Sequence, residues 1–232
     1  MEWLQALDGN LFLNLNSYRS AWGDSFFLLF SGKLIWIPMY AAMLFALFRY
    51  LRWQQALILV LGVALLITCT DQFCSHLLRP IFARPRPGNP VSDIFSQVFL
   101  APGYNPRGNG FPSCHAANTM ALAMFFSLIF RRRPLVIFLF LWALVTCYSR
   151  IYLAAHYPGD LLIGSLIGIL FAWIIYGLAS WLTEIATKSR LPRREYPVRC
   201  KIWGRRTVNL YCSNVVIIVG LLTILYMIIV SL

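Results

Sequence analysis

The sequence predicts an all-α bundle of membrane-spanning helices, and three observations support that prediction. Of the 232 residues, 59% are hydrophobic and only 12% are charged, whereas roughly a quarter of the residues in a soluble domain are charged. The apolar residues form long runs and not the amphipathic helices that would cover a large soluble core. The basic residues, which give the chain a net charge of +12, flank those runs.

Six apolar runs are candidate membrane spans, because a helix needs about 20 apolar residues to cross the hydrocarbon core. Two of them are short, and the polar residues at their ends would lie at interface depth. Before the first run, residues 1–24 mix apolar side chains with Asp8 and three asparagines. This mixture predicts a short amphipathic helix at the membrane interface, with a disordered tail as the alternative. The six runs are Phe26–Phe48, Ala56–Leu78, Ala116–Phe130, Leu135–Tyr152, Leu161–Leu182 and Val215–Leu232.

The basic residues predict how the chain is threaded, because segments rich in Lys and Arg remain in the cytoplasm. Such segments follow every second run, at 49–55, 131–133 and 183–211. All three can therefore lie on one face of the membrane. The opposite face would hold both termini, the loop 79–113 and the turn 149–160. Since topology explains most of the charge, no nucleic acid partner is predicted.

The loop and the turn on that opposite face contain cations that run against the topological preference. Five arginines lie there, together with all three histidines of the chain. Arginine presents a planar fork of donors that matches the oxygens of a phosphate group, so an anionic ligand is the simplest reason for this placement. The residues are Arg79, Arg84, Arg86, Arg107 and Arg150, with His76, His115 and His156.

Three short motifs stand at the ends of apolar runs. They are Arg79-x6-Arg86-Pro87, Pro112-Ser113-Cys114-His115 and Ser149-Arg150-x5-His156-x3-Asp160. In these motifs and their order the sequence resembles the type 2 phosphatidic acid phosphatase superfamily, whose pattern is K-x6-RP, then PSGH, then SR-x5-H-x3-D. The resemblance covers roughly residues 56–182, within a chain that is expected to form one domain, 1–232.

Two positions depart from the family pattern. Arg79 replaces the family lysine, which keeps the charge and exchanges a point donor for a fork. Cys114 replaces the family glycine, and its Cβ is expected to crowd the phosphate or shift the loop, because glycine lets backbone approach a ligand closely. Both departures concern the fine geometry and the substrate range more than the reaction class.

The resemblance implies hydrolysis through a phosphohistidine intermediate. His156 would attack phosphorus, Asp160 would orient its imidazole, and His115 would protonate the leaving oxygen and then activate water. The residues that would bind the phosphate are Arg79, Arg86, Ser113, Cys114 and Arg150. No metal or cofactor is expected, because carboxylates are scarce around these loops and arginines would neutralise the phosphate.

The sequence therefore predicts an integral membrane phosphatase that acts on a membrane lipid. Among the substrates that the resemblance implies, lipid A phosphate and undecaprenyl diphosphate are favoured, and phosphatidylglycerol phosphate and phosphatidate are alternatives. In a bacterium the protein would lie in the inner membrane with its site facing the periplasm. Rivals of other classes are a lipid transporter, a non-catalytic envelope protein and a vanadate haloperoxidase. A transporter more often has helices broken at mid-depth by Gly or Pro, whereas here these residues lie in the loops.

Overall fold

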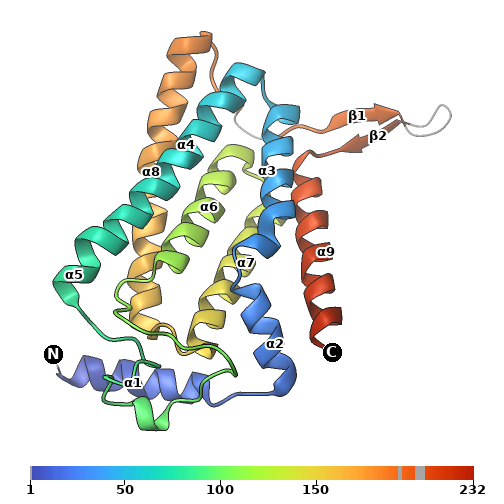
Figure 1. Cartoon of the computed structure of the whole chain (residues 1–232). Coiled ribbons are helices and arrows are strands. Elements are labelled where there is room, and N and C mark those ends of the chain that lie inside the picture. Colours follow the sequence, from blue (N-terminus) through green and yellow to red (C-terminus); the bar gives the residue numbers. More distant parts are fainter. Residues whose placement is uncertain (1, 193–194, 202–206) are drawn as a thin grey trace.

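The computed structural model describes residues 2–192, 195–201 and 207–232, and most of them form helices packed into one bundle (Figure 1). Short 3-10 turns lie at Leu34–Trp36 and Phe95–Gln97, and a π-helical turn lies at Phe73–Leu78. A small antiparallel hairpin pairs β1 (Val198–Lys201) with β2 (Thr207–Leu210). The predicted helical membrane bundle is confirmed, and the hairpin is an addition to it. In chain order the helices are α1 (Glu2–Asn16), α2 (Ala21–Phe30), α3 (Ile37–Tyr50), α4 (Trp53–Gln72), α5 (Arg79–Phe82), α6 (Cys114–Phe130), α7 (Arg133–Tyr152), α8 (Pro158–Thr187) and α9 (Ser213–Ser231).

Within the described residues, four helical segments are long and apolar enough to cross a membrane: Trp53–Phe82, Arg133–Tyr152, Pro158–Thr187 and Ser213–Ser231. A fifth span is formed if α2 and the segment Leu34–Tyr50 are counted together, although the two are bent by 68°. At 17 residues, α6 is shorter than most spans. The expected number of six spans is therefore not confirmed and remains a prediction.

The bend between α2 and α3 differs from the single continuous span that was expected over Phe26–Phe48. The indole N–H of Trp36 donates to the carbonyl of Phe30 at 2.9 Å, which holds the chain in the turn. Pro38 then lies in the first turn of α3, where a missing N–H costs no helical hydrogen bond. One apolar run in the sequence is thus two helices in the structure.

The centre of the bundle is α6, which packs against α4, α7 and α8 (Figure 1). Two glycines of α8 permit a very close approach. A Cβ on Gly164 would lie 2.4 Å from the carbonyl oxygen of Ser113, and one on Gly168 would lie 2.1 Å from that of Ala117. Small residues at helix interfaces allow this kind of packing in membranes. It fixes the start of α6 beside the first turns of α8.

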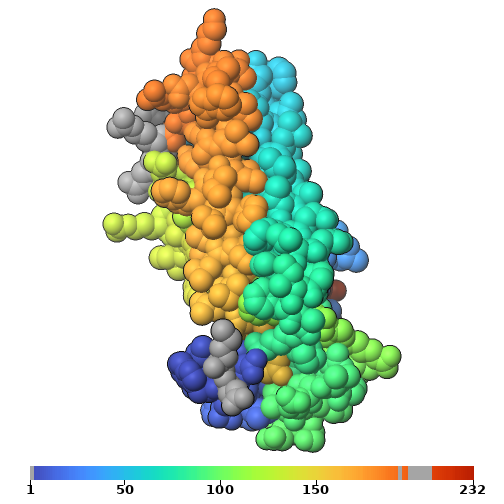
Figure 2. All heavy atoms as spheres, turned by 90° about the vertical axis from the view of Figure 1, so that its left-hand side faces the viewer, coloured from blue at the N-terminus to red at the C-terminus, as the bar shows by residue number. Residues whose placement is uncertain are grey.

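The sides of the bundle are apolar. Figure 2 shows α4 and α8 side by side along one face, with α1 and the long loop after α5 below them. Both helices carry exposed apolar side chains, which suit contact with lipid tails. They include Leu57, Leu61, Leu65, Leu162, Leu166, Leu170 and Trp173.

The two ends of the bundle hold different segments (Figure 1). The lower end in the figure, called the site end below, holds α1, the loop Ala83–Ser113 and the turn between α7 and α8. The upper end, called the basic end, holds the turns before α4 and α7 and the hairpin. This arrangement agrees with the predicted alternation of motif-bearing and basic segments. Four arginines of the basic segment 183–211, namely Arg193, Arg194, Arg205 and Arg206, lie outside the described residues.

Candidate active site

Backbone hydrogen bonds join the three motifs at the site end. The N–H of Ser113, in the second motif, donates to the carbonyl of Asp160, in the third, at 3.1 Å. The N–H of Gly88, just after the first motif, donates to the carbonyl of Ala154 at 2.9 Å. These bonds connect segments that are far apart in the sequence, so the side chains of all three motifs stand on a common main-chain frame.

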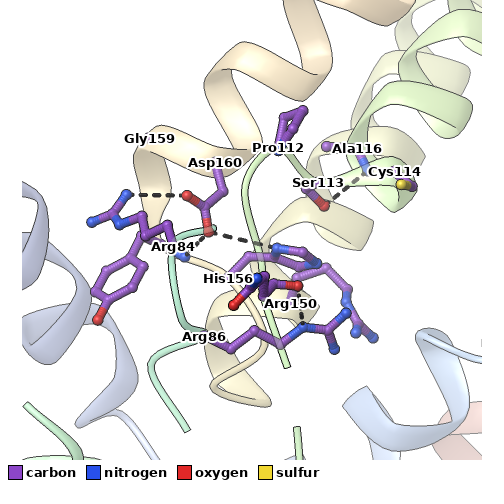
Figure 3. Close-up of polar contacts among 12 residues, drawn as sticks. Arg84, Arg86, Pro112, Ser113, Cys114, Ala116, Arg150, His156, Gly159 and Asp160 are labelled. Atoms are coloured by element: carbon purple, nitrogen blue, oxygen red, sulfur yellow. Dashed lines mark hydrogen bonds and ion pairs between the residues drawn. The ribbon is translucent and has the colours of Figure 1, made fainter. Parts of the chain in front are cut away.

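The first motif contributes Arg79 and Arg86, each held by a backbone carbonyl. Arg79, at the start of α5, donates to the carbonyl of Pro112 at 3.3 Å and to the sulfur of Cys114 at 2.9 Å. Arg86 donates from Nε to the carbonyl of Asn109 at 3.2 Å, as Figure 3 shows. Both guanidinium groups are thereby directed toward the second motif and the loop that precedes it.

The third motif contributes Arg150, which is almost fully buried. Its guanidinium hydrogen-bonds the hydroxyl of Ser31 and donates to the hydroxyl of Tyr104 at 2.8 Å. The Nε atoms of Arg79 and Arg150 are buried and have no hydrogen-bond partner within the part of the chain that the structure describes. Buried donors in proteins are nearly always paired. Two unpaired guanidinium N–H groups at one site are suited to the oxygens of an anion.

His156, just before α8, and Asp160, in the first turn of α8, face each other, and both are buried (Figure 3). Nδ1 of the imidazole lies 3.6 Å from Oδ2 of the carboxylate. That oxygen also accepts a hydrogen bond from the N–H of Tyr157 at 3.0 Å, which fixes the carboxylate at the start of α8. Because Nδ1 is turned to the carboxylate, Nε2 is the ring nitrogen left for a ligand.

The surroundings of His156 keep its imidazole neutral. Burial lowers the pKa of His156 well below its usual value, and the positive charges of Arg150, Arg86 and Arg79 lower it further. The backbone of Gly110, which lies beside the imidazole, raises the pKa and so acts in the opposite sense. Burial, followed by the charge of Arg150, also lowers the pKa of Arg86. A neutral imidazole among cations has a lone pair available to attack an electrophile that the cations bind.

The second motif forms the start of α6. Ser113 is its N-cap, and the Oγ atom accepts a hydrogen bond from the N–H of Ala116 at 3.4 Å. The sulfur of Cys114 accepts a hydrogen bond from Arg79. The side chain that replaces the family glycine therefore helps to hold one of the arginines of the site. His115 lies close enough to His156 to interact with it electrostatically, and the structure thus gathers all eight predicted site residues.

An apolar cavity of about 420 Å³ opens beside this motif. Cys114, His115 and Asn118 line it on the side of the motif, and Lys33 also borders it. The remaining lining is largely apolar and comes from α3, α4 and α6. His115 therefore stands between the cluster of arginines and an apolar space.

Two residues that contact the site were absent from the predicted site residues. Arg84 donates from one nitrogen to Asp160 at 3.0 Å and to Asp8 of α1 at 2.7 Å. Arg84 shared one sequence signal with the motif arginines, since it lies against the topological preference. Asp8 had no such sequence signal, because it belongs to a segment of interfacial character and lies 76 residues from Arg84. The other cations of these loops, His76 and Arg107, are exposed.

The fold and the site together define a family of membrane phosphatases. The sequence pattern of the PAP2 superfamily matches residues 57–184, the stretch that holds all three motifs. The chain belongs to this superfamily, and it is an integral membrane lipid phosphatase. The reaction class predicted from the sequence is thereby confirmed.

Similarity to one relative extends over the whole chain, and two others match about three quarters of it. The chain is 42% identical over 231 residues to the lipid A 4′-phosphatase of Bacteroides thetaiotaomicron, which covers 100% of this chain and 98% of that protein. It is 35% identical over 176 residues to the lipid A 4′-phosphatase of Porphyromonas gingivalis, with 76% and 74% of the two chains covered. The crystal structure of Aquifex aeolicus LpxE matches with a TM-score of 0.55 at 28% identity, over 72% of this chain and 93% of that chain.

Proposed function

We propose that this protein removes the 4′-phosphate of lipid A. The observation that carries the proposal is the 42% identity, over the full chain, to a relative of that name. The alignment includes α1, the hairpin and α9, which lie outside residues 57–184. Because the alignment covers these peripheral parts in addition to the motif-bearing core, the likeness favours the same substrate in addition to the same reaction.

The proposed reaction has two steps. In the first, Nε2 of His156 attacks phosphorus in line, while the bond between phosphorus and the sugar oxygen breaks. Asp160 faces Nδ1, orients the ring and balances the positive charge that develops on it. His115, protonated while the bound phosphate offsets the charges of Arg150 and Arg86, gives its proton to the departing oxygen. In the second step His115 takes a proton from water, which attacks the phosphohistidine and releases inorganic phosphate.

Arginines would balance the charge on the transferred phosphoryl group. The unpaired Nε–H groups of Arg79 and Arg150 provide donors without breaking an existing contact, and Arg86 adds a third positive charge. Ser113 and Cys114 lie at the N-terminus of α6, where free backbone N–H groups attract phosphate. Because side chains supply this charge, we infer that hydrolysis needs no metal ion.

The site is proposed to open to the periplasm from the inner membrane. The turns at the basic end include Arg49, Arg52 and Arg131, and such turns remain on the cytoplasmic side. The site end would then lie in the plane of the outer leaflet's headgroups, where α1 exposes Trp3 and Leu7. A lipid phosphate in that leaflet is within reach of the arginines without leaving the membrane.

The test is a panel of lipid phosphates incubated with the purified protein in excess EDTA. Lipid A should lose one phosphate, at the 4′ position, faster than undecaprenyl diphosphate, phosphatidylglycerol phosphate or phosphatidate release phosphate. Mass spectrometry of the lipid locates the phosphate that is lost. Loss of the 1-phosphate, or a faster reaction with another lipid, would overturn the substrate. Activity that disappears in EDTA and returns with Mg²⁺ would overturn metal independence.

A further inference from the structure

On the side away from His156, Asp160 is hydrogen-bonded to Arg84 (Figure 3), and Arg84 in turn contacts Asp8 of α1, a helix that no motif includes. One nitrogen of Arg84 lies 3.0 Å from Oδ1 of Asp160 and 2.7 Å from Oδ2 of Asp8. The other oxygen of Asp8 accepts a hydrogen bond from the N–H of Gly159, in the first turn of α8, at 2.8 Å. Two carboxylates, one from α1 and one from α8, thus share one guanidinium group.

The guanidinium of Arg84 is also fixed in orientation. It lies 3.8 Å from the ring centre of Tyr157, a favourable cation–π arrangement. The hydroxyl of Tyr157 is hydrogen-bonded to that of Ser92 at 2.9 Å, and its ring packs against Phe12 of α1 with 5.5 Å between centroids. Arg84 is therefore held between α1 and α8, and it cannot leave Asp160 without disturbing both.

Charge balance explains why two carboxylates are used. Asp160 is fully buried, and a buried carboxylate is stable in its charged form only when it is paired. Arg84 provides that pairing. A guanidinium bound to Asp160 alone would also cancel much of the field that the carboxylate exerts on His156. Asp8 offsets the positive charge of Arg84. Asp8, Arg84 and Asp160 together therefore carry a net negative charge beside the imidazole of His156.

We propose that Asp8 and Arg84 are positioning residues for His156, which they affect through Asp160. Arg84 keeps the Asp160 carboxylate charged and aimed at Nδ1, and Asp8 prevents Arg84 from neutralising it. This inference rests on the proposed role of His156 as the nucleophile. It makes α1, whose other face exposes Trp3, Leu4 and Leu7, a part of the catalytic assembly in addition to an interfacial element.

A purely structural role, in which Asp8 and Arg84 only fasten α1 to α8, differs from this proposal in its pH dependence. His156 must be neutral to attack, so activity falls on the acid side as the His156–Asp160 pair takes up a proton. A nearby negative charge moves that acid limb to higher pH, and a nearby positive charge moves it to lower pH. The charged and titratable groups that surround the pair are Asp8 of α1, Arg79, Arg84 and Arg86 of the first motif, His115 of α6, and Arg150 and Tyr157 of the third.

The experiment compares kcat and KM against pH in the full-length protein. Asp8→Asn removes a negative charge, so the acid limb of kcat should move down by about one pH unit. Arg84→Gln removes a positive charge, so the limb should move up by a similar amount and kcat should fall about 10²-fold. Arg84→Lys keeps the positive charge, so its acid limb should lie at the same pH as in the wild type. Its kcat should lie between those of the wild type and Arg84→Gln. KM should change little in all three, since the residues that bind phosphate are untouched.

Exposed charges of the neighbouring loop provide matched controls. Asp93→Asn and Arg107→Gln change the net charge by the same amounts and should leave both the limb and kcat in place. Equal losses of kcat in the Asp8 and Arg84 variants with an unmoved limb, or shifts in the same direction, would overturn the proposal in favour of a structural fastening.

Two further measurements keep the result decisive. Binding of vanadate to each variant, followed across pH by calorimetry, needs no turnover, and it shows both that the protein is folded and where the site takes up its proton. Each assay is run on lipid A and on a short-chain phosphatidate. If the wild-type protein cleaves only phosphatidate, lipid A is not its substrate. The acid limb measured with phosphatidate should still shift in opposite directions in the Asp8 and Arg84 variants, and these shifts decide the role of the two residues.

Discussion

Both ends of the bundle contain arginines, but the structure holds the two sets differently. At the site end, Arg150 is 5% exposed, and its Nε has no partner within the described part of the chain. At the basic end, the side chain of Arg190 is 81% exposed and pairs with Glu184 at 2.8 Å, and Arg131 donates to the carbonyl of Leu128 in its own helix. A cation that faces water needs no ligand, whereas a buried donor does.

Arg132 shows that contact with other segments is not what separates the two ends. Its guanidinium donates to Ser213 at 2.9 Å, hydrogen-bonds the side chain of Asn214 and lies 3.8 Å from the ring centre of Tyr211. These partners belong to the protein, so Arg132 ties the start of α7 to α9. The comparison teaches that buried guanidinium groups with an unpaired N–H, more than the number of arginines, distinguish the proposed anion site among the described residues.

The largest effect is expected at the centre of the site end. His156→Ala should abolish turnover together with any phosphoenzyme, because the variant lacks the proposed nucleophile. Rapid quenching with radiolabelled substrate measures both. His76→Ala is the matched control, since His76 is an exposed histidine at the same end whose ring hydrogen-bonds Ser75 at 2.9 Å. Turnover by the His156 variant, or a phosphoryl group found on His115, would contradict the assignment.

A second substitution separates the two histidines of the site end. His115→Ala should slow hydrolysis of a sugar or alkyl phosphate by about 10²–10⁴-fold, the usual contribution of a general acid. Hydrolysis of a diphosphate should suffer less, because the departing phosphate needs less help from a proton. Single-turnover rates with the two substrates measure the difference. An equal loss with both leaving groups would mean that His115 does not protonate the leaving oxygen.

A matched pair of arginines tests the comparison itself. Arg150→Lys should lower kcat/KM by about 10- to 100-fold, because a charge-assisted hydrogen bond contributes about 1.5–3 kcal/mol and the lysine cannot reproduce the fork. Arg132→Lys should leave kcat/KM within about twofold and reduce the free energy of unfolding by about 1 kcal/mol through the loss of stacking on Tyr211. Equal losses of activity in the two variants would show that burial of the donors does not distinguish the two ends.

The sequence predicted the helices better than it predicted their interruptions. Long apolar runs locate helices because lipid leaves backbone groups no other way to be satisfied. The bend after Phe30 coincides with the short interruption Ser31-Gly32-Lys33 inside a run that is otherwise largely apolar, and it is held by the hydrogen bond from Trp36 to Phe30. The hairpin of β1 and β2 lies in a basic segment whose charge pattern predicts topology and says nothing of strand pairing.

The sequence could predict only the candidate site residues that belong to the three motifs, because the order and spacing of these motifs resemble the family pattern. His156 lies just before α8 and Asp160 lies in its first turn, so their contact depends on the turn at the start of α8, where the Asp160 carboxylate accepts a hydrogen bond from the N–H of Tyr157. Arg84 and Asp8 are 76 residues apart, and their contact depends on how α1 packs across the end of the bundle. Asp8 also looks like one polar residue among several in an amphipathic segment. Only the fold distinguishes it from its neighbours.

The last prediction concerns the orientation of the two ends and expects no change in activity. Arg107→Cys, at the site end, and Arg133→Cys, at the basic end, both replace an exposed arginine, so they change the net charge equally. In spheroplasts, a membrane-impermeant maleimide should label the cysteine at position 107. The cysteine at position 133 should react only after the membrane is opened, because basic turns remain in the cytoplasm. The wild-type chain, labelled in parallel, gives the background from its native cysteines, and lipid phosphatase assays show whether each variant is intact. The reverse pattern of labelling would place the site on the cytoplasmic face. The substrate would then have to be a lipid whose phosphate lies in the inner leaflet. The proposed chemistry of His156 and the arginines would be unchanged.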